Sequence, residues 1–192
     1  PAKQVIPALE AWIATLDPKK PDTEHHLFEA LSVFESHEVV NRQLLETLLA
    51  AKDYRARAYA TRVVGRWSDR LQAPLELLDR SVSDENARVR LEAIVACSDI
   101  PSAGAMVVAA KATDKPMDRF TDHALSQTAH ALVPHWLPAL KDGKIQFERP
   151  PNLTFVLRAY GGKDVVAKVR GLLGGDDLNP AASTSLMTLL VE

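Results

Sequence analysis

Six histidines and 25 acidic residues raise the question of a metal site, because several of them share a helix face. His25 and His26 lie four and three residues before Glu29, and His123 lies seven residues before His130. A protein metal site needs three or four converging ligands, and the chain has neither an H-E-x-x-H motif nor a Cys/His cluster. We therefore interpret these histidines as surface or partly buried residues and expect no metal and no other cofactor.

Arginines gather in the segment 52–90, which holds nine basic and six acidic residues and carries a net charge of +3, whereas the whole chain carries −2. Arg62, Arg66 and Arg70 follow one another in steps of four, along one helix flank and its continuation. Such a ridge fits phosphate groups or an acidic partner. Because the excess is small and acids are interleaved, we favour a solvated helix flank and do not expect nucleic acid as the partner.

No nucleophile stands in a recognisable catalytic setting. Cys97 follows the apolar residues 94–96 and is interpreted as a small buried hydrophobe. The sequence contains no G-x-S-x-G and no G-x-x-x-x-G-K motif, and a single cysteine excludes a disulfide within the chain. No apolar run approaches the roughly 18–20 residues of a membrane span. We expect no catalytic residue and no membrane-spanning segment in these 192 residues.

The elements that must position these side chains are helices, because apolar residues recur at helical rather than alternating spacing. The first predicted helix covers residues 5–16, and the second is capped by Asp22 or Thr23 and carries Leu27, Leu31 and Phe34. The others are predicted over residues 38–51, 54–67, 74–81, 87–96, 102–112, 117–133, 152–160, 163–173 and 180–191. The segment 144–147 is the one candidate strand.

The same residue order recurs along the chain. Residues 55–63, 88–96 and 119–127 align at offsets of 33 and 31, and each block follows a turn aspartate. The aligned small residues are Ala60, Ala93 and Ala124, which let paired helices approach closely. A repeat of about 30 residues that contains two helices is typical of an α-solenoid, in which each unit buries its apolar stripe against its neighbours. The alternative is a helical bundle, which gives no reason for a repeated order of Asp, Arg and Ala.

Glycines divide the chain. Six of the eight lie at or beyond Gly143. We therefore assign helical repeats to residues 1–142 and a C-terminal helical cap, or the start of a linker, to residues 143–192. The predicted fold class is all-α: an α-solenoid of helical hairpins with that cap.

Residues 84–93, Asp-Glu-Asn-Ala-Arg-Val-Arg-Leu-Glu-Ala, resemble a HEAT repeat. The run from Glu24 through this segment to Asp114–Asp118 and His135-Trp136 is similar to a helical module of large proteins in planctomycetes, verrucomicrobia and related bacteria. Those proteins join a dehydrogenase-like β-propeller, HEAT-like repeats and a C-terminal cytochrome c segment. The resemblance implies a module of a larger exported protein. No haem site transfers, because the chain lacks C-x-x-C-H.

The resemblance also implies roles for the repeated residues. In HEAT-like arrays the turn aspartate pairs with the repeat arginine of the adjacent unit and caps the following helix, so Asp84 is expected to reach Arg57 and Asp114 to reach Arg90. The predicted structural residues are Asp53, Arg57, Asp84, Arg90 and Asp114. The inner helices are expected to begin near Tyr54, Ala87 and Asp118 and to supply the contacts. The candidate binding residues are Arg55, Arg62, Arg66, Arg88 and Arg119.

The predicted function is a non-catalytic scaffold, monomeric as an isolated fragment, that binds another protein or neighbouring domains of its own polypeptide. Two alternatives remain open. One is a HEAT-like DNA-binding protein or DNA glycosylase that uses the arginine-rich segment 52–90. The other is a metal-dependent oxygenase, because the His37-Glu38 pair resembles the dyads of HEAT-type di-iron hydroxylases, which need several such pairs.

Overall fold

A computed structural model describes residues 2–161 together with residues 171, 180 and 187. Over these residues the chain forms ten α-helices and one 3-10 helix and contains no strand, which confirms the predicted all-α class. The α-helices are α1 (Ala2–Ile13), α2 (Thr23–Ser36), α3 (Arg42–Leu49), α4 (Tyr54–Arg66), α5 (Pro74–Ser81), α6 (Ala87–Ser98), α7 (Ala103–Ala110), α8 (Arg119–Ala131), α9 (Val133–Lys141) and α10 (Pro150–Gly161), and the 3-10 helix η1 covers Lys111–Asp114.

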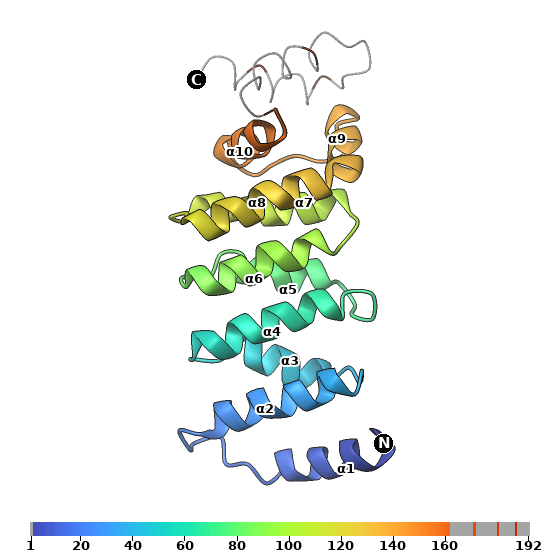
Figure 1. Cartoon of the computed structure of the whole chain (residues 1–192), viewed down its shortest axis with the longest axis vertical. Helices are drawn as coiled ribbons and strands as arrows, with labels where there is room; N and C mark the ends of the chain where they lie inside the picture. Colours follow the sequence, from blue (N-terminus) through green and yellow to red (C-terminus); the bar gives the residue numbers. More distant parts are fainter. Residues whose placement is uncertain (1, 162–170, 172–179, 181–186, 188–192) are drawn as a thin grey trace.

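The helices lie side by side in an elongated stack that follows the chain from one end to the other (Figure 1). The even-numbered helices contact one another in order, and their first residues are separated by 31, 33, 32 and 31 positions. Behind them in this view lie α3, α5 and α7, which are eight residues long, against 12 to 14 for the even-numbered helices. The chain therefore exposes one side built from its longer helices.

Side-chain caps begin five of these ten α-helices. The side chains of Asn41, Asp53, Asn86, Ser102 and Asp118 each accept a hydrogen bond from a backbone N–H of the first helical turn. Such a cap contributes about 1 kcal/mol. The predicted cap of α2 is absent, since Asp22 has helical φ and ψ angles and its side chain accepts no capping hydrogen bond.

The core is one continuous apolar cluster that runs from Ile6 in α1 to Leu157 in α10, and α4 and α6 make its most extensive helix contact. Val63 and Val64 of α4, Trp67 directly after it and Ile94 of α6 are fully buried. The two helices approach closely at Gly65, where an added Cβ would stand 2.8 Å from the Cβ of Ala96 and 2.9 Å from its Cα. The two helices can pack at this distance because Gly65 has no side chain.

Two sequence predictions differ from the structure. The predicted helix 117–133 corresponds to α8, whereas α9, which begins at Val133 and extends to Lys141, was not predicted. The missed α9 contains Pro134 in its first turn, where no backbone N–H is needed, so that proline starts the helix rather than breaking it. Residues 144–147 form no strand. The helices predicted over 163–173 and 180–191 lie outside the described residues, apart from Gly171, Pro180 and Met187, which are helical.

Asn152 attaches α10 to the rest of the stack. Its side chain is buried, and its amide nitrogen lies 3.2 Å from the carbonyl oxygen of Ala110, 2.8 Å from Oγ1 of Thr113 and 3.0 Å from Oδ1 of Asp114. Its side-chain oxygen accepts the N–H of Arg149 at 3.0 Å. One side chain thus joins α10 to the end of α7 and to η1.

We expect Asn152→Ala to reduce the free energy of unfolding by about 2 kcal/mol, because it removes these hydrogen bonds and leaves buried acceptors without a donor. Urea denaturation should show a lower midpoint. Thr154→Ala is the control, since Thr154 is exposed on the same helix and bonds only to the carbonyl oxygen of Pro150. Equal losses for the two variants would contradict the role assigned to Asn152.

Candidate functional site

Arg57 joins two successive turns of the stack. Its Nη1 donates to the carbonyl oxygens of Ala51 and Lys52, both at 2.9 Å. Its Nε and Nη2 donate to the two carboxylate oxygens of Asp84 at 2.7 and 2.9 Å, so the predicted ion pair is present and bidentate. Burial raises the pKa of Asp84, but the hydrogen bonds from Arg57 and from the N–H of Asn86, with the positive charge of Arg57, outweigh it and hold this pKa below its ordinary value.

Arg90 makes the same contacts with its own turn but not with the next one. Its Nη1 donates to the carbonyl oxygens of Asp84 and Glu85, both at 2.9 Å, which lie six and five residues upstream as they do for Arg57. The predicted ion pair with Asp114 is absent, since Nη2 of Arg90 donates to the carbonyl oxygen of Pro116 at 2.7 Å. Pro116 precedes α8 by the same three residues by which Asp84 precedes α6, and it offers only a carbonyl group.

The predicted capping roles hold for one of the three turn aspartates. Asp53 caps α4, whereas α6 is capped by Asn86 and α8 by Asp118. Asp84 instead bonds to the backbone N–H of Asn86. Asp114 is engaged by the C-terminal segment, through the contact with Asn152 and an ion pair with Arg149, so its predicted cap is wrong.

The guanidinium group of Arg90 donates to three carbonyl oxygens at once, and we call this type of contact the arginine clamp. It predicts that position 90 specifically requires arginine. We expect Arg90→Lys to lose about 2 kcal/mol of stability, because an ammonium group cannot reproduce the planar fork that reaches three carbonyl oxygens at once. The measurement is thermal or urea unfolding. Arg88→Lys is the matched control on the neighbouring exposed position, and a loss there as large as at Arg90 would refute the clamp.

The candidate functional site is the exposed side of the even-numbered helices, which we call the even face. It is centred on Glu92 of α6, whose side chain is 9% exposed and which accepts from Nη2 of Arg62 at 3.0 Å and from Nη2 of Arg88 at 2.8 Å. Both arginines are more exposed, at 42% and 53%. Two outward guanidinium groups therefore share one inward carboxylate.

A second pair repeats this layering between α2 and α4. The carboxylate of Glu35, 11% exposed, accepts from the hydroxyl of Tyr59 and from Nη1 of Arg66, which is 59% exposed. Burial raises the pKa of Tyr59, and the hydrogen bond to Glu35 raises it further, so this phenol is a donor rather than a base. The sequence interpretation missed Glu35 and Glu92, although each is about one repeat from its arginine, at 31 and 30 residues.

The candidate binding residues thus divide into two groups. Arg62, Arg66 and Arg88 lie together around Glu35 and Glu92. Arg55 pairs with Asp53 at the start of α4, and Arg119 stacks on Phe120 at the start of α8, with 4.6 Å between its Cζ and the ring centroid. Arg70, which continued the predicted ridge, lies beyond α4 and pairs with Glu38 and Asp69.

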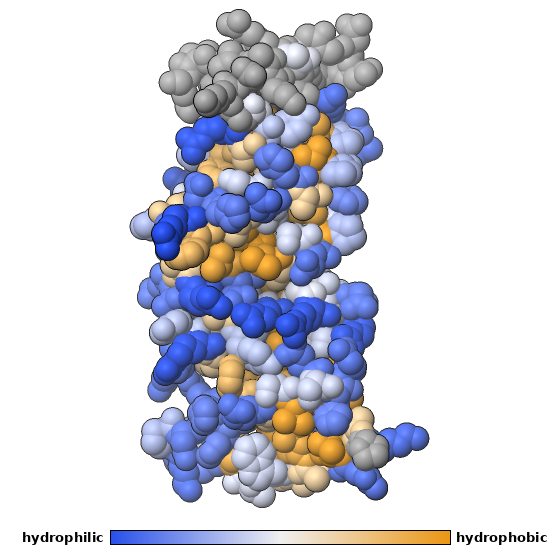
Figure 2. Space-filling model, viewed as in Figure 1, coloured by the Kyte–Doolittle hydropathy of each residue, from blue (hydrophilic) through white to orange (hydrophobic). Residues whose placement is uncertain are grey.

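A groove of about 340 Å³ opens on the even face between α4 and α6. Its lining combines two arginines, two acids and a short apolar floor: Arg62, Arg66, Glu92, Asp99, Val95 and Ala96. Val95 and Phe120 are among the exposed large apolar side chains, at 44% and 56%. Figure 2 shows a hydrophilic band across α4 and α6, with apolar surface beside it over α6 and α8.

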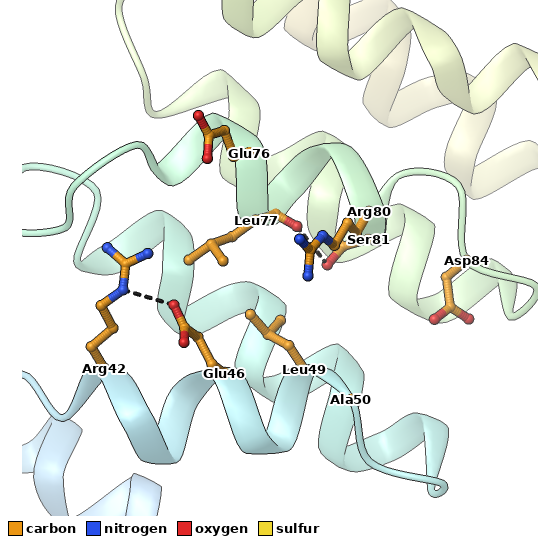
Figure 3. A pocket seen from close by; sticks show the side chains of 9 residues that line it. All are labelled: Arg42, Glu46, Leu49, Ala50, Glu76, Leu77, Arg80, Ser81 and Asp84. Atoms are coloured by element: carbon orange, nitrogen blue, oxygen red, sulfur yellow. Dashed lines mark hydrogen bonds and ion pairs between the residues drawn. The ribbon is translucent and has the colours of Figure 1, made fainter.

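A second groove, of about 380 Å³, lies on the other side of the stack between α3 and α5 (Figure 3). Arg42 and Glu46 of α3 form an ion pair at 2.7 Å along its edge, and Leu77 of α5 faces into it. Ser81 accepts from the hydroxyl of Thr61 and donates to the carbonyl oxygen of Leu77, so its hydroxyl serves structural contacts. The charged residues that line this second groove are of both signs and are largely paired, so this groove is the weaker candidate.

The residues considered for metal or nucleophilic chemistry make packing contacts instead. His26 packs edge-on against Trp12, with ring centroids 5.6 Å apart, and His25 stacks on Phe28 at 6.4 Å. Within the described part of the chain, no three His, Cys, Asp or Glu side chains converge as metal ligands would. Cys97 is fully buried, as predicted, and burial raises the pKa of its thiol.

In the region that the structure describes, no helix combines the length and the apolar character that crossing a membrane requires. Comparison of the chain with protein-family models, with curated proteins and with solved structures finds no match.

Proposed function

We propose that this chain is an α-solenoid of HEAT-like helical hairpins that acts as a non-catalytic scaffold. It binds another protein, or neighbouring domains of its own polypeptide, through the even face. As a working hypothesis, the chain is one module of a larger protein, like the large planctomycete and verrucomicrobial proteins whose helical module it resembles.

The observation that carries the proposal is the repeated arginine clamp. Arg57 and Arg90 hold the carbonyl oxygens six and five residues before them and reach forward to the following turn. A contact that recurs with the same sequence spacing supports stacked equivalent units, since each unit is then attached to the next in the same way. Such a stack presents a continuous side on which a partner can make many distributed contacts.

The charge arrangement favours a protein partner over DNA. Acids are interleaved with the arginines of the even face: Glu35, Glu92 and Asp99 lie beside Arg62, Arg66 and Arg88, so this surface is not the uniformly basic strip that a continuous phosphate backbone requires. The even face also exposes Val95 and Phe120, and apolar and aromatic side chains next to arginine are typical of protein interfaces.

Photo-crosslinking in the cells that naturally produce the protein would test the proposal. A photoreactive amino acid replaces Val95 on α6 or His123 on α8, and the control replaces Gln43, which is exposed on α3. We expect both even-face positions to crosslink to protein and the control position not to do so. Equal crosslinking from all three positions, or crosslinking mainly to nucleic acid, would count against the scaffold.

A further inference from the structure

We propose that the groove between α4 and α6 binds an acidic segment of a partner protein, with carboxylates on Arg62 and Arg66 and an apolar side chain against Val95. This inference rests on the proposed scaffold function and adds the chemical class of the partner. Its three elements are the layering of charge, the composition of the groove and the distribution of the remaining acids.

The charge is layered through the depth of the surface. The carboxylates of Glu35 and Glu92 lie beneath, while the guanidinium groups that hold them lie outside. A guanidinium has five N–H donors and uses at most two of them on one carboxylate. Arg62 bonds to Glu92 through Nε and Nη2, and the bond of Arg66 to Glu35 is through Nη1, so further N–H groups remain for an incoming acceptor.

The buried acids also prepare the arginines for binding. An exposed arginine loses much of its side-chain freedom when a ligand immobilises it. Glu92 and Glu35 have already fixed the side chains of Arg62 and Arg66, so a partner carboxylate meets oriented donors. The two arginines come from successive turns of one helix, four residues apart, which matches two carboxylates on one short segment.

The floor of the groove supplies the apolar contact. Val95 and Ala96 line it next to both arginines, and Val95 is 44% exposed. An apolar partner side chain that covers Val95 would remove apolar surface from water and exclude water from the ion pairs around it. The partner segment is therefore expected to carry acidic residues next to an aliphatic or aromatic one.

A protein segment fits this site better than a nucleic acid. Asp99 also lines the groove and would repel a continuous row of phosphates. A peptide can place its backbone N–H or a polar side chain opposite Asp99 and its carboxylates opposite the arginines. Duplex DNA has a phosphate at every step and cannot avoid Asp99 in this way.

The test begins with a library of random 12-residue peptides displayed on phage and selected on the whole chain. We expect the selected peptides to be rich in Asp and Glu next to Leu, Ile, Val or Phe. Synthetic, fluorescein-labelled copies are then titrated by fluorescence anisotropy. Arg66→Gln should weaken binding at least tenfold, since it removes a charge-assisted hydrogen bond to a partner carboxylate. Val95→Asp should weaken it at least as much by repulsion and by loss of the apolar contact.

The matched control is Arg80→Gln, which removes the same charge from an exposed arginine of α5 and should change the affinity less than twofold. Thermal unfolding of each variant verifies that it is folded. Because Val95 holds no buried partner, Val95→Asp keeps the test valid even where an arginine variant is destabilised.

Three results would overturn the inference: selected peptides without acidic bias, equal effects of Arg66→Gln and Arg80→Gln, or tighter binding of a 20-base-pair duplex than of any peptide. If positions 95 and 123 still crosslink to protein, the failure concerns the partner class alone. If those crosslinks are absent as well, the scaffold function fails with it.

Discussion

Gly65→Leu is expected to reduce the free energy of unfolding by about 3 kcal/mol, the upper end of the cost of overfilling a packed site. A Cβ at this position would already stand 2.9 Å from the Cα of Ala96, so backbone rather than a flexible side chain blocks the space. The helices α4 and α6 would have to separate, and their contact is the most extensive in the described stack. Urea denaturation at constant pH measures the loss.

The matched control is Gly104→Ala on α7. An added Cβ there meets the end of the Leu75 side chain at 3.3 Å, and this methyl group can move aside. Alanine also has a better helix propensity than glycine, by about 1 kcal/mol, so we expect Gly104→Ala to be neutral or slightly stabilising. If leucine at position 65 were tolerated as well as alanine at position 104, the close crossing of α4 and α6 would not be a determinant of the stack.

The second large effect is expected at Asp84. We expect Asp84→Ala to lose about 3 kcal/mol, because it leaves the guanidinium of Arg57 without its carboxylate where the two side chains are only 20% and 14% exposed. Asp53→Ala removes a cap and a more exposed pair, and we expect about 1 kcal/mol for it. A double-mutant cycle with Arg57→Ala should assign most of the Asp84 loss to the pair.

The same pair has a predictable dependence on pH. The pKa of Asp84 is lower in the folded chain than its ordinary value near 3.9, so its carboxylate stabilises the fold in full above about pH 4. This contribution is lost as the pH falls through the lowered pKa. The difference in stability between the wild type and Asp84→Asn should therefore be constant at neutral pH and shrink in acid. A difference that grew on acidification would show that the sign is wrong.

Sequence reasoning succeeded for the contact between Arg57 and Asp84. The resemblance to HEAT-like arrays implied the Arg57–Asp84 pair, and the structure contains it. It failed for Arg90, because Pro116 stands where the next aspartate would be needed and supplies only its carbonyl oxygen. A change of a single residue type in a turn alters a contact that spacing alone predicts.

Other features depend on depth and distance, which residue types do not encode. Of the aligned alanines, Ala60 and Ala93 are fully buried and Ala124 is partly buried, but the close contact that an added side chain would block is at Gly65 and Ala96, which no repeat position singled out. The burial of Glu92 beneath two arginines is likewise a property of the assembled surface. A separation near one repeat length would have indicated this partner, because it places two side chains on adjacent even-numbered helices.

The unequal lengths of the helices set the footprint that a partner can occupy. A helix of 13 residues is about 20 Å long, and neighbouring helix axes lie about 9–10 Å apart. Four even-numbered helices, α2 to α8, therefore offer a rectangle of roughly 20 by 35–40 Å, close to the about 800 Å² that each side contributes to a stable protein complex. A second molecule lying flat across these four helices would find enough area for durable attachment without touching the shorter helices behind.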